Sequence, residues 1–208
     1  MNDTERSTPD LLVATARELF AQKGYDGTSI RAITDRARVN LAAVTYHFGS
    51  KEALYAAVVA SVAQPLRNRV EELARGTGLP ADRVGRILHA YFDHFADHPD
   101  MPKLVIQQLF TGRPLPAPLR EAMGGILAAL VGVIAEGQGR GEFRTGDPRL
   151  FALSTLAQPI YFNIVRRPLA LAGLLDLGEA ADRERVVAHV TRFALAGLAP
   201  STPEVECG

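Results

Sequence analysis

Two aspartates and two histidines near the middle of the chain have a spacing that can bind a metal ion. Asp93 and Asp97 are four residues apart, and so are His94 and His98. Residues at this spacing share one face of a helix, where carboxylate and imidazole groups can chelate a divalent cation. The alternative is a solvated helix end whose histidines interact favourably with the C-terminal dipole. We favour the alternative and expect no metal and no other cofactor, because a structural site needs a third strong ligand and Cys207 is remote in sequence.

Three consecutive residues, Thr45, Tyr46 and His47, bring a hydroxyl, a phenol and an imidazole together. Such groups can contact base edges, thymine methyl groups and phosphates of DNA. The small residues Ala42 and Ala43 come just before them and would let the backbone approach a duplex closely. Two interpretations compete here: a tightly packed helical corner, or a short helix whose exposed face binds a partner.

The elements that must position these side chains are helices almost throughout. Proline and glycine fall mostly between segments of helical periodicity, and no long alternating strand pattern occurs. Thr8 before Pro9 is a good helix start, and Gly24 is a plausible stop. The sequence predicts an all-α fold with helices over about residues 8–24, 28–37, 40–48, 50–74, 81–97, 101–111, 116–138, 148–165 and 182–197.

The second and third of these helices have helix-turn-helix proportions. Val39 and Val44 would pack against Ile30, Ile33 and the first helix, which leaves the two alanines and the three polar residues on or near the outer face. We therefore expect a helix-turn-helix whose second helix presents these residues to DNA.

Phosphate contacts are expected at helix starts. Thr28 and Ser29 stand where the second helix begins, Asn40 stands where the third begins, and Lys51 lies in the first turn of the fourth. Residues 23–51 hold five Lys or Arg and two Asp, a local charge of +3, although the whole chain balances 23 basic against 23 acidic residues. A basic surface, if present, must be local.

The run LLVATARELFAQKGYDGTSIRAITDRARVNLAAVTYHFGSKEALYAAVV is similar to the N-terminal domain of the TetR family of bacterial transcriptional regulators. The resemblance covers about residues 9–59 and implies that Arg31 can reach a base edge, while Tyr46, His47 and Lys51 contact the DNA backbone. At the position of Arg38 the family usually has glycine. If the turn needs a positive φ there, arginine costs on the order of 1 kcal/mol, or it adds a phosphate contact.

The resemblance also implies an N-terminal helix-turn-helix DNA-binding domain and a C-terminal helical bundle for ligand binding and dimerisation. We place the boundary near residue 50, inside a shared helix, which gives domains of 1–50 and 51–208. A homodimer is implied, paired through the last two helices. The expected apolar stripes of these helices are Leu153, Leu156, Ala157 and Ile160, and Val186, Val190 and Phe193.

Aromatic residues cluster in the larger part, and the default interpretation of each one is core. As a group beside amide side chains they favour a cavity for a small, largely apolar effector. The candidate lining residues are Tyr91, Phe95, Gln107, Gln108, Phe110, Gln158, Tyr161, Phe162 and Asn163. Pro159 lies inside this region and would kink its helix.

No catalytic signature stands out: no Gly-rich phosphate loop, G-x-S-x-G or H-E-x-x-H occurs. The polar N-terminus is unlike a signal peptide, and the longest central uncharged run, of 14 residues, is too short for a membrane span. We expect a cytoplasmic, ligand-released repressor that binds an inverted-repeat operator. The alternatives are a small helical enzyme or carrier, and a DNA-binding protein without an effector.

Overall fold

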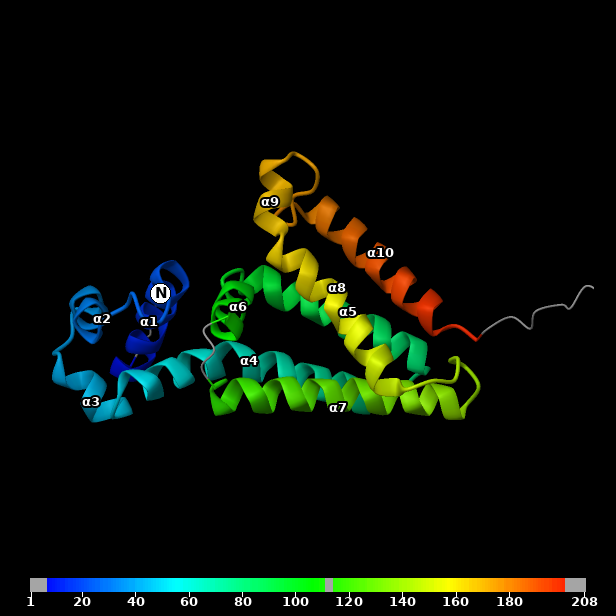
Figure 1. Cartoon of the computed structure of the whole chain (residues 1–208), viewed down its shortest axis with the longest axis horizontal. Coiled ribbons are helices and arrows are strands. Elements are labelled where there is room, and N and C mark those ends of the chain that lie inside the picture. The colour runs from blue at the N-terminus through cyan, green and yellow to red at the C-terminus, as the bar shows by residue number, and fades with distance from the viewer. Residues whose placement is uncertain (1–6, 111–113, 201–208) are drawn as a thin grey trace, which may run out of the picture. The chain divides into compact units, whose positions relative to one another are not determined.

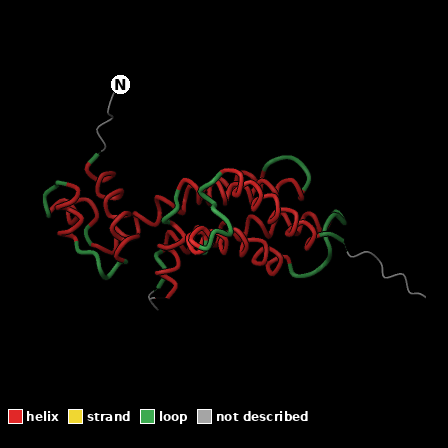
Figure 2. The backbone as a smooth tube through the Cα atoms, turned by 90° about the horizontal axis from the view of Figure 1, so that it is seen from above, coloured by secondary structure: helices red, strands yellow, loops and turns green. Residues whose placement is uncertain are grey.

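The computed structural model describes residues 7–110 and 114–200, without the side chains of residues 103 and 107–110. Figure 2 shows helices and loops and no strand in these ranges, so the all-α prediction is confirmed. The helices, labelled in Figure 1, are α1 (Thr8–Lys23), α2 (Ile30–Ala37), α3 (Ala42–Phe48), α4 (Lys51–Arg75), α5 (Pro80–Asp97), α6 (Met101–Phe110), α7 (Ala117–Gly139), α8 (Pro148–Ile164), α9 (Arg166–Leu171) and α10 (Ala180–Leu198).

Contacts divide the chain into two compact units. The first holds Met1–Pro65 with His98–Ala122, and the second holds Leu66–Asp97 with Met123–Gly208. Helix α4 contributes to both units because it continues through Pro65 without a break. The domain boundary expected at residue 50 stays a prediction. The contacts place the first part of α4 and all of α6 in the unit that holds α1–α3.

The first unit has a small apolar core. Leu12 and Phe20 of α1, Ile33 of α2, Val44 of α3 and Leu54 of α4 are each fully buried. Each such side chain contributes about 1.5–3 kcal/mol when taken out of water. The expected packing of Ile33 and Val44 against the first helix follows from this core, which fixes how α3 is presented.

The second unit is built around α5, α8 and α10, which pack against one another. Its core includes Ile87 and Leu88 from α5, Leu156 from α8 and Val190 from α10. The buried residues of α5 include Val84, Ile87, Leu88 and Tyr91, which repeat with the three-to-four-residue period of a helix. This apolar centre leaves other faces of α8 and α10 open.

The start of α1 and the presence of α9 differ from the expectation. The N-cap of α1 is Ser7, whose Oγ accepts the N–H of Asp10 at 3.4 Å, so Thr8 is the first helical residue. Helix α9 was missed because its proline looked like a break. Pro168 is the third residue of α9, in the first turn, where a missing N–H leaves no helical hydrogen bond unmade.

Helix α7 is the one helix in the described ranges that is long and apolar enough to cross a membrane. Core helices of soluble proteins pass the same test, so the property by itself is weak evidence. Arg120, Glu121 and Glu136 lie within the helix, which is longer than the uncharged run recognised in the sequence.

Candidate nucleic-acid interface

The turn between α2 and α3 depends on one left-handed residue, Arg38, which has φ 56° and ψ 42°. In this turn the backbone N–H of Arg38 donates to the Asp35 carbonyl at 3.3 Å, and that of Val39 donates to the Thr34 carbonyl at 3.0 Å. These bonds close the end of α2. A side chain in this conformation costs about 1–2 kcal/mol. Arg38 thus has the positive φ that was considered for this turn from the sequence, and its side chain is exposed.

The outer face of α3 carries the polar side chains expected there. Val44 points inward and is fully buried, whereas Thr45, Tyr46 and His47 are exposed. Tyr46 is 84% exposed, and its ring lies 4.8 Å from that of His47, nearly perpendicular to it. A large, amphipathic ring left uncovered on a short helix indicates a surface that binds a partner. The interpretation of this segment as only a packed corner is therefore excluded for these three residues.

The start of α3 is held by Asn40. Its Oδ1 accepts the N–H of Ala42, the first residue of α3, at 2.8 Å, so the side chain fixes the turn that leads into the helix. Ala42 is exposed and Ala43 is partly buried. Asn40 thus positions α3, and the small side chains leave room for the backbone of this helix to approach a ligand.

Thr28 requires a correction. It is only 1% exposed, and its Oγ1 donates to the carbonyl oxygens of Leu19, at 3.2 Å, and Gly24, at 2.8 Å. The hydroxyl therefore closes the end of α1 and is not presented to a phosphate. Ser29, by contrast, is exposed at the start of α2, where its Oγ accepts the N–H of Ala32 at 3.1 Å. The exposed N-terminal turn of α2 remains the candidate phosphate seat.

Lys51 opens α4 beside an aromatic cluster. Its Nζ lies 4.3 Å from the centroid of the Tyr25 ring, which in turn packs against Phe20 and Tyr55. A hydrogen bond from Tyr25 is the main reason that the pKa of the neighbouring Glu52 lies below its usual value. The cation–π contact orients Lys51 while leaving its ammonium group partly exposed.

Arg31 lies on the exposed side of α2. Its side chain is 83% exposed and reaches Asp35 with only a long contact of 4.0 Å. Arg36 behaves differently, because it donates to Glu18 of α1 at 2.7 Å. Of these two cations on α2, Arg31 is therefore the one held less tightly by the protein.

The residues expected around an effector cavity are not gathered in one place. Tyr91 and Phe95 are each 4% exposed and pack as core, with ring centroids 5.8 Å apart, and burial raises the pKa of Tyr91. Tyr161 is 62% exposed and faces out of α8. This outward position differs from the expectation that it lines a cavity.

The remaining candidates are divided. Gln158 and Phe162 are partly buried. Asn163 is 5% exposed, and its Nδ2 donates to the Pro159 carbonyl within α8 at 2.8 Å, so its amide serves its own helix. Helix α8 continues through Pro159. The side chains of Gln107, Gln108 and Phe110 lie outside the described residues.

Two hollows are present in the second unit, and none of the candidate effector residues whose side chains the structure describes lines either of them. One, of about 540 Å³, lies between α4 and α5, where Arg69, Arg86, His89 and Asp93 border it. The other, of about 520 Å³, lies between α4 and α7 and has a floor of small residues. The second hollow adjoins a buried arginine, Arg83, whose environment the sequence did not reveal.

The candidate metal ligands do not converge. The described residues contain no group of three or more His, Cys, Asp or Glu side chains suited to hold an ion. His98 lies with its Nδ1 3.2 Å from Nη2 of Arg17, which also pairs with Asp100. His98 is thus part of a link between α1 and the segment before α6.

Comparison with known proteins gives the same class as the fold. The family model of bacterial regulatory proteins, tetR family, matches residues 12–58, and that of the tetracyclin repressor-like C-terminal domain matches residues 80–193, more than half of the chain. The HTH-type transcriptional repressor NicS of Pseudomonas putida is 25% identical over 195 residues, which cover 92% of each protein.

Solved structures agree. A TetR/AcrR transcriptional regulator from Thermobifida fusca is 27% identical with a TM-score of 0.68, covering 92% of this chain and 98% of that one. A tetR-family regulatory protein from Rhodococcus RHA1 has a TM-score of 0.78 at 20% identity, covering 95% of this chain and all of that one, which shows the shared fold.

The exposed α3 on a helix-turn-helix scaffold and these matches define a DNA-binding transcriptional regulator rather than an enzyme. The chain belongs to the TetR family. The matched C-terminal region contains α7, which makes this helix part of the regulatory domain rather than a membrane anchor.

Proposed function

We propose that the chain is a homodimeric repressor that binds an inverted-repeat operator through α3 and is released by a small effector. The observation that carries the proposal is the uncovered outer face of α3, with Tyr46 84% exposed above a fully buried Val44. A structural helix of seven residues would be expected to bury its largest side chain. Binding to the major groove accounts for leaving it in solvent.

The contacts can be divided by what each group reaches. Thr45 and Arg31 extend from exposed positions toward base edges, whereas Tyr46, His47 and Lys51 contact phosphates. Ser29 and Asn40 hold the starts of α2 and α3, whose free N–H groups favour phosphate. Ala42 and Ala43 allow the close approach.

Dimerisation is supported by an exposed apolar face on α8 and α10. Leu153, Ile160, Tyr161 and Ile164 of α8 are 38–62% exposed, and Phe193 of α10 is 61% exposed. Uncovered apolar side chains on neighbouring helices are typical of an association surface. Leu156, Val186 and Val190 were expected in this interface, but they are buried inside the protomer, and Tyr161 and Ile164 take their place on the outer face.

The repressor role and the effector rest on relatives and on energetics. NicS is described as a repressor. A ligand that shifts the regulator from 1:99 to 99:1 between bound and released forms must prefer the released form by about 5.5 kcal/mol. Gln158 and Phe162, both partly buried, remain candidates to line its site. A location in the cytoplasm follows from contact with DNA.

The test measures binding to a random-sequence duplex by fluorescence anisotropy over a range of salt concentrations. We expect Lys51→Gln to lower the slope of log K against log salt by about 1, and Tyr46→Ala to weaken binding. The matched control is Arg69→Gln, an exposed arginine of the second unit paired with Glu72, which should bind like the parent chain. An unchanged slope in Lys51→Gln would contradict the interface.

A further inference from the structure

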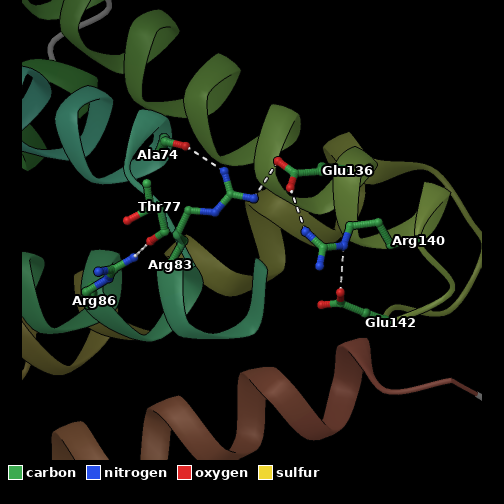
Figure 3. Close-up of polar contacts among 7 residues, drawn as sticks. All are labelled: Ala74, Thr77, Arg83, Arg86, Glu136, Arg140 and Glu142. Atoms are coloured by element: carbon green, nitrogen blue, oxygen red, sulfur yellow. Dashed lines mark hydrogen bonds and ion pairs between the residues drawn. The ribbon is translucent and has the colours of Figure 1, made fainter. Parts of the chain in front are cut away.

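A buried arginine of the second unit, Arg83, has two guanidinium nitrogens on one edge without a hydrogen-bond partner among the described residues. Arg83 of α5 is 6% exposed, and its Nη1 donates to the Ala74 carbonyl at 2.9 Å, which fixes the plane of the guanidinium (Figure 3). Nη2 contacts the carboxylate of Glu136 from α7. The buried Nε–H has no acceptor among the described residues. A buried donor that stays unpaired destabilises the fold, so a new acceptor would be favoured there.

Glu136 is shared between two arginines. One of its oxygens meets Arg83, and the other accepts from Nη1 of Arg140 at 3.3 Å, while Nε of Arg140 pairs with Glu142 at 2.7 Å (Figure 3). Contact with Arg83 is the main reason that the pKa of Glu136 lies below its usual value, so this carboxylate stays ionised. Its side chain is 42% exposed. Glu136 can therefore turn toward solvent and Arg140 without losing an ionic partner.

The guanidinium edge formed by Nε and Nη2 is the edge that binds a carboxylate with two parallel hydrogen bonds. Glu136 forms an ion pair with Nη2, but neither Nη2 nor Nε has a hydrogen-bond partner among the described residues. Both nitrogens are covered in the present arrangement, so another carboxylate could reach them only in the place of Glu136. An incoming carboxylate that used both donors would satisfy Nε, which Glu136 leaves unpaired.

The groove beside Arg83 has room for the rest of such a molecule. Its volume is about 520 Å³, and its floor on α7 consists of small residues, Gly125, Ala128, Ala129 and Gly132. A Cβ added at Gly132 would meet no atom within 4 Å, so the space above this residue is open. The ion pair of Arg67 and Glu71 closes one end, since Nε of Arg67 and Oε1 of Glu71 lie 2.5 and 2.7 Å from the Cβ position of Gly125. A narrow apolar chain fits this floor, and ligand sites of this size are common.

We propose that the groove between α4 and α7 binds a small carboxylic acid with a slim apolar body, whose carboxylate displaces Glu136 and pairs with Nε and Nη2 of Arg83. Glu136 then acts as an internal competitor that occupies the site when the ligand is absent. This site is separate from the interface on α3, and its binding is measured without DNA.

The test uses sodium octanoate as the probe and isothermal titration calorimetry on the full chain. We expect one octanoate per chain, and binding of 1-octanol at least tenfold weaker, because the alcohol has no carboxylate to pair with Arg83. Glu136→Gln removes the competing charge and should tighten octanoate binding about tenfold. If Glu136 only stabilises Arg83, this variant will bind no more tightly than the parent chain.

Two glycine variants separate the groove from non-specific binding. Gly132→Leu fills open space on the floor and should abolish the octanoate signal, while it favours the helix. Gly124→Leu is the matched control, because Gly124 also has open space on α7 but does not line the groove. Loss of binding in Gly132→Leu alone supports the site. Equal octanoate binding by the parent and both leucine variants overturns it, as does no binding to the parent chain. Melting curves confirm that each variant is folded, and Gly132→Leu decides the matter if Glu136→Gln unfolds.

Discussion

Arg17 of α1 pairs with both carboxylate oxygens of Asp100, which lies 83 residues further along the chain, just before α6. Nε of Arg17 lies 2.8 Å from Oδ2 of Asp100, and Nη2 contacts Oδ1. The two side chains are only 22% and 26% exposed. Within the first unit, this fork-like pair ties the helix that supports α3 to the start of α6. A partly buried pair with this geometry contributes more than an exposed one.

Asp100→Asn should lower the free energy of unfolding by about 1–2 kcal/mol at pH 7, because Arg17 then lacks its charged partner in a partly buried place. Urea denaturation followed by circular dichroism measures the change. Glu18→Gln is the control, since it removes another ion pair of α1, to Arg36, whose side chains are 56% and 51% exposed. That variant should change stability by less than about 0.5 kcal/mol. If the two variants lower the free energy of unfolding equally, the partly buried pair of Arg17 and Asp100 contributes no more than an exposed ion pair.

The contribution of Asp100 should also depend on pH. Partial burial raises its pKa, but the hydrogen bonds and charge of Arg17 outweigh burial and leave the pKa below the usual value. A carboxyl group with a depressed folded pKa stabilises the protein above its unfolded pKa, and the effect is lost as pH falls through the folded pKa. The stability difference between the parent chain and Asp100→Asn should thus shrink as pH falls below about 4. A stability difference that grows as the pH falls would contradict this prediction.

Arg38→Gly should stabilise the chain by about 1 kcal/mol, because glycine adopts the positive φ of this turn without the clash that a Cβ causes. Arg38→Ala keeps the Cβ and serves as the control, with no such gain expected. If Arg38 contacts a phosphate, both variants should bind DNA more weakly, and Arg38→Gly should do so despite its higher melting temperature. Equal stability of the glycine and alanine variants would mean that the turn is not strained.

Phe193→Asp should convert the proposed dimer into a monomer, because it puts a charge on the exposed apolar face of α8 and α10. Sedimentation velocity at micromolar concentration distinguishes the two states. Leu79→Asp is the matched control, as Leu79 is 50% exposed but lies between α4 and α5. We expect it to remain dimeric. A parent chain that sediments as a monomer would contradict the proposed interface.

Periodicity was sufficient to predict the long helices, because such a helix buries an apolar stripe that repeats every three to four residues, but it did not predict the short helix α9. The positive φ at Arg38 was also foreseeable, from a resemblance in which glycine is usual. The hydrogen-bond partners of the side chains could not be predicted from the sequence. Thr28 looked like a phosphate ligand at a helix start, but its hydroxyl bonds to the carbonyls of Leu19 and Gly24, and this depends on how α1 ends.

The larger part of the chain was harder to interpret from sequence. An apolar residue on a helix has the same periodicity whether it faces a core or a partner, so the sequence could not show that Tyr161 is exposed and Val186 buried. Arg83 forms its ion pair with Glu136, which lies 53 residues away in the sequence. No local sequence pattern connects these two residues.

Selection of bound fragments from a random duplex library tests the central proposal most directly. Two copies of α3 held by symmetry must meet half-sites about one helical turn, or a multiple of it, apart. We therefore expect the parent chain to enrich an inverted repeat and to bind it with two chains per duplex. Tyr46→Ala and Phe193→Asp should each fail to enrich it. A folded parent chain that enriches no sequence, or one without two-fold symmetry, would contradict the account of a dimeric repressor that binds its operator through α3.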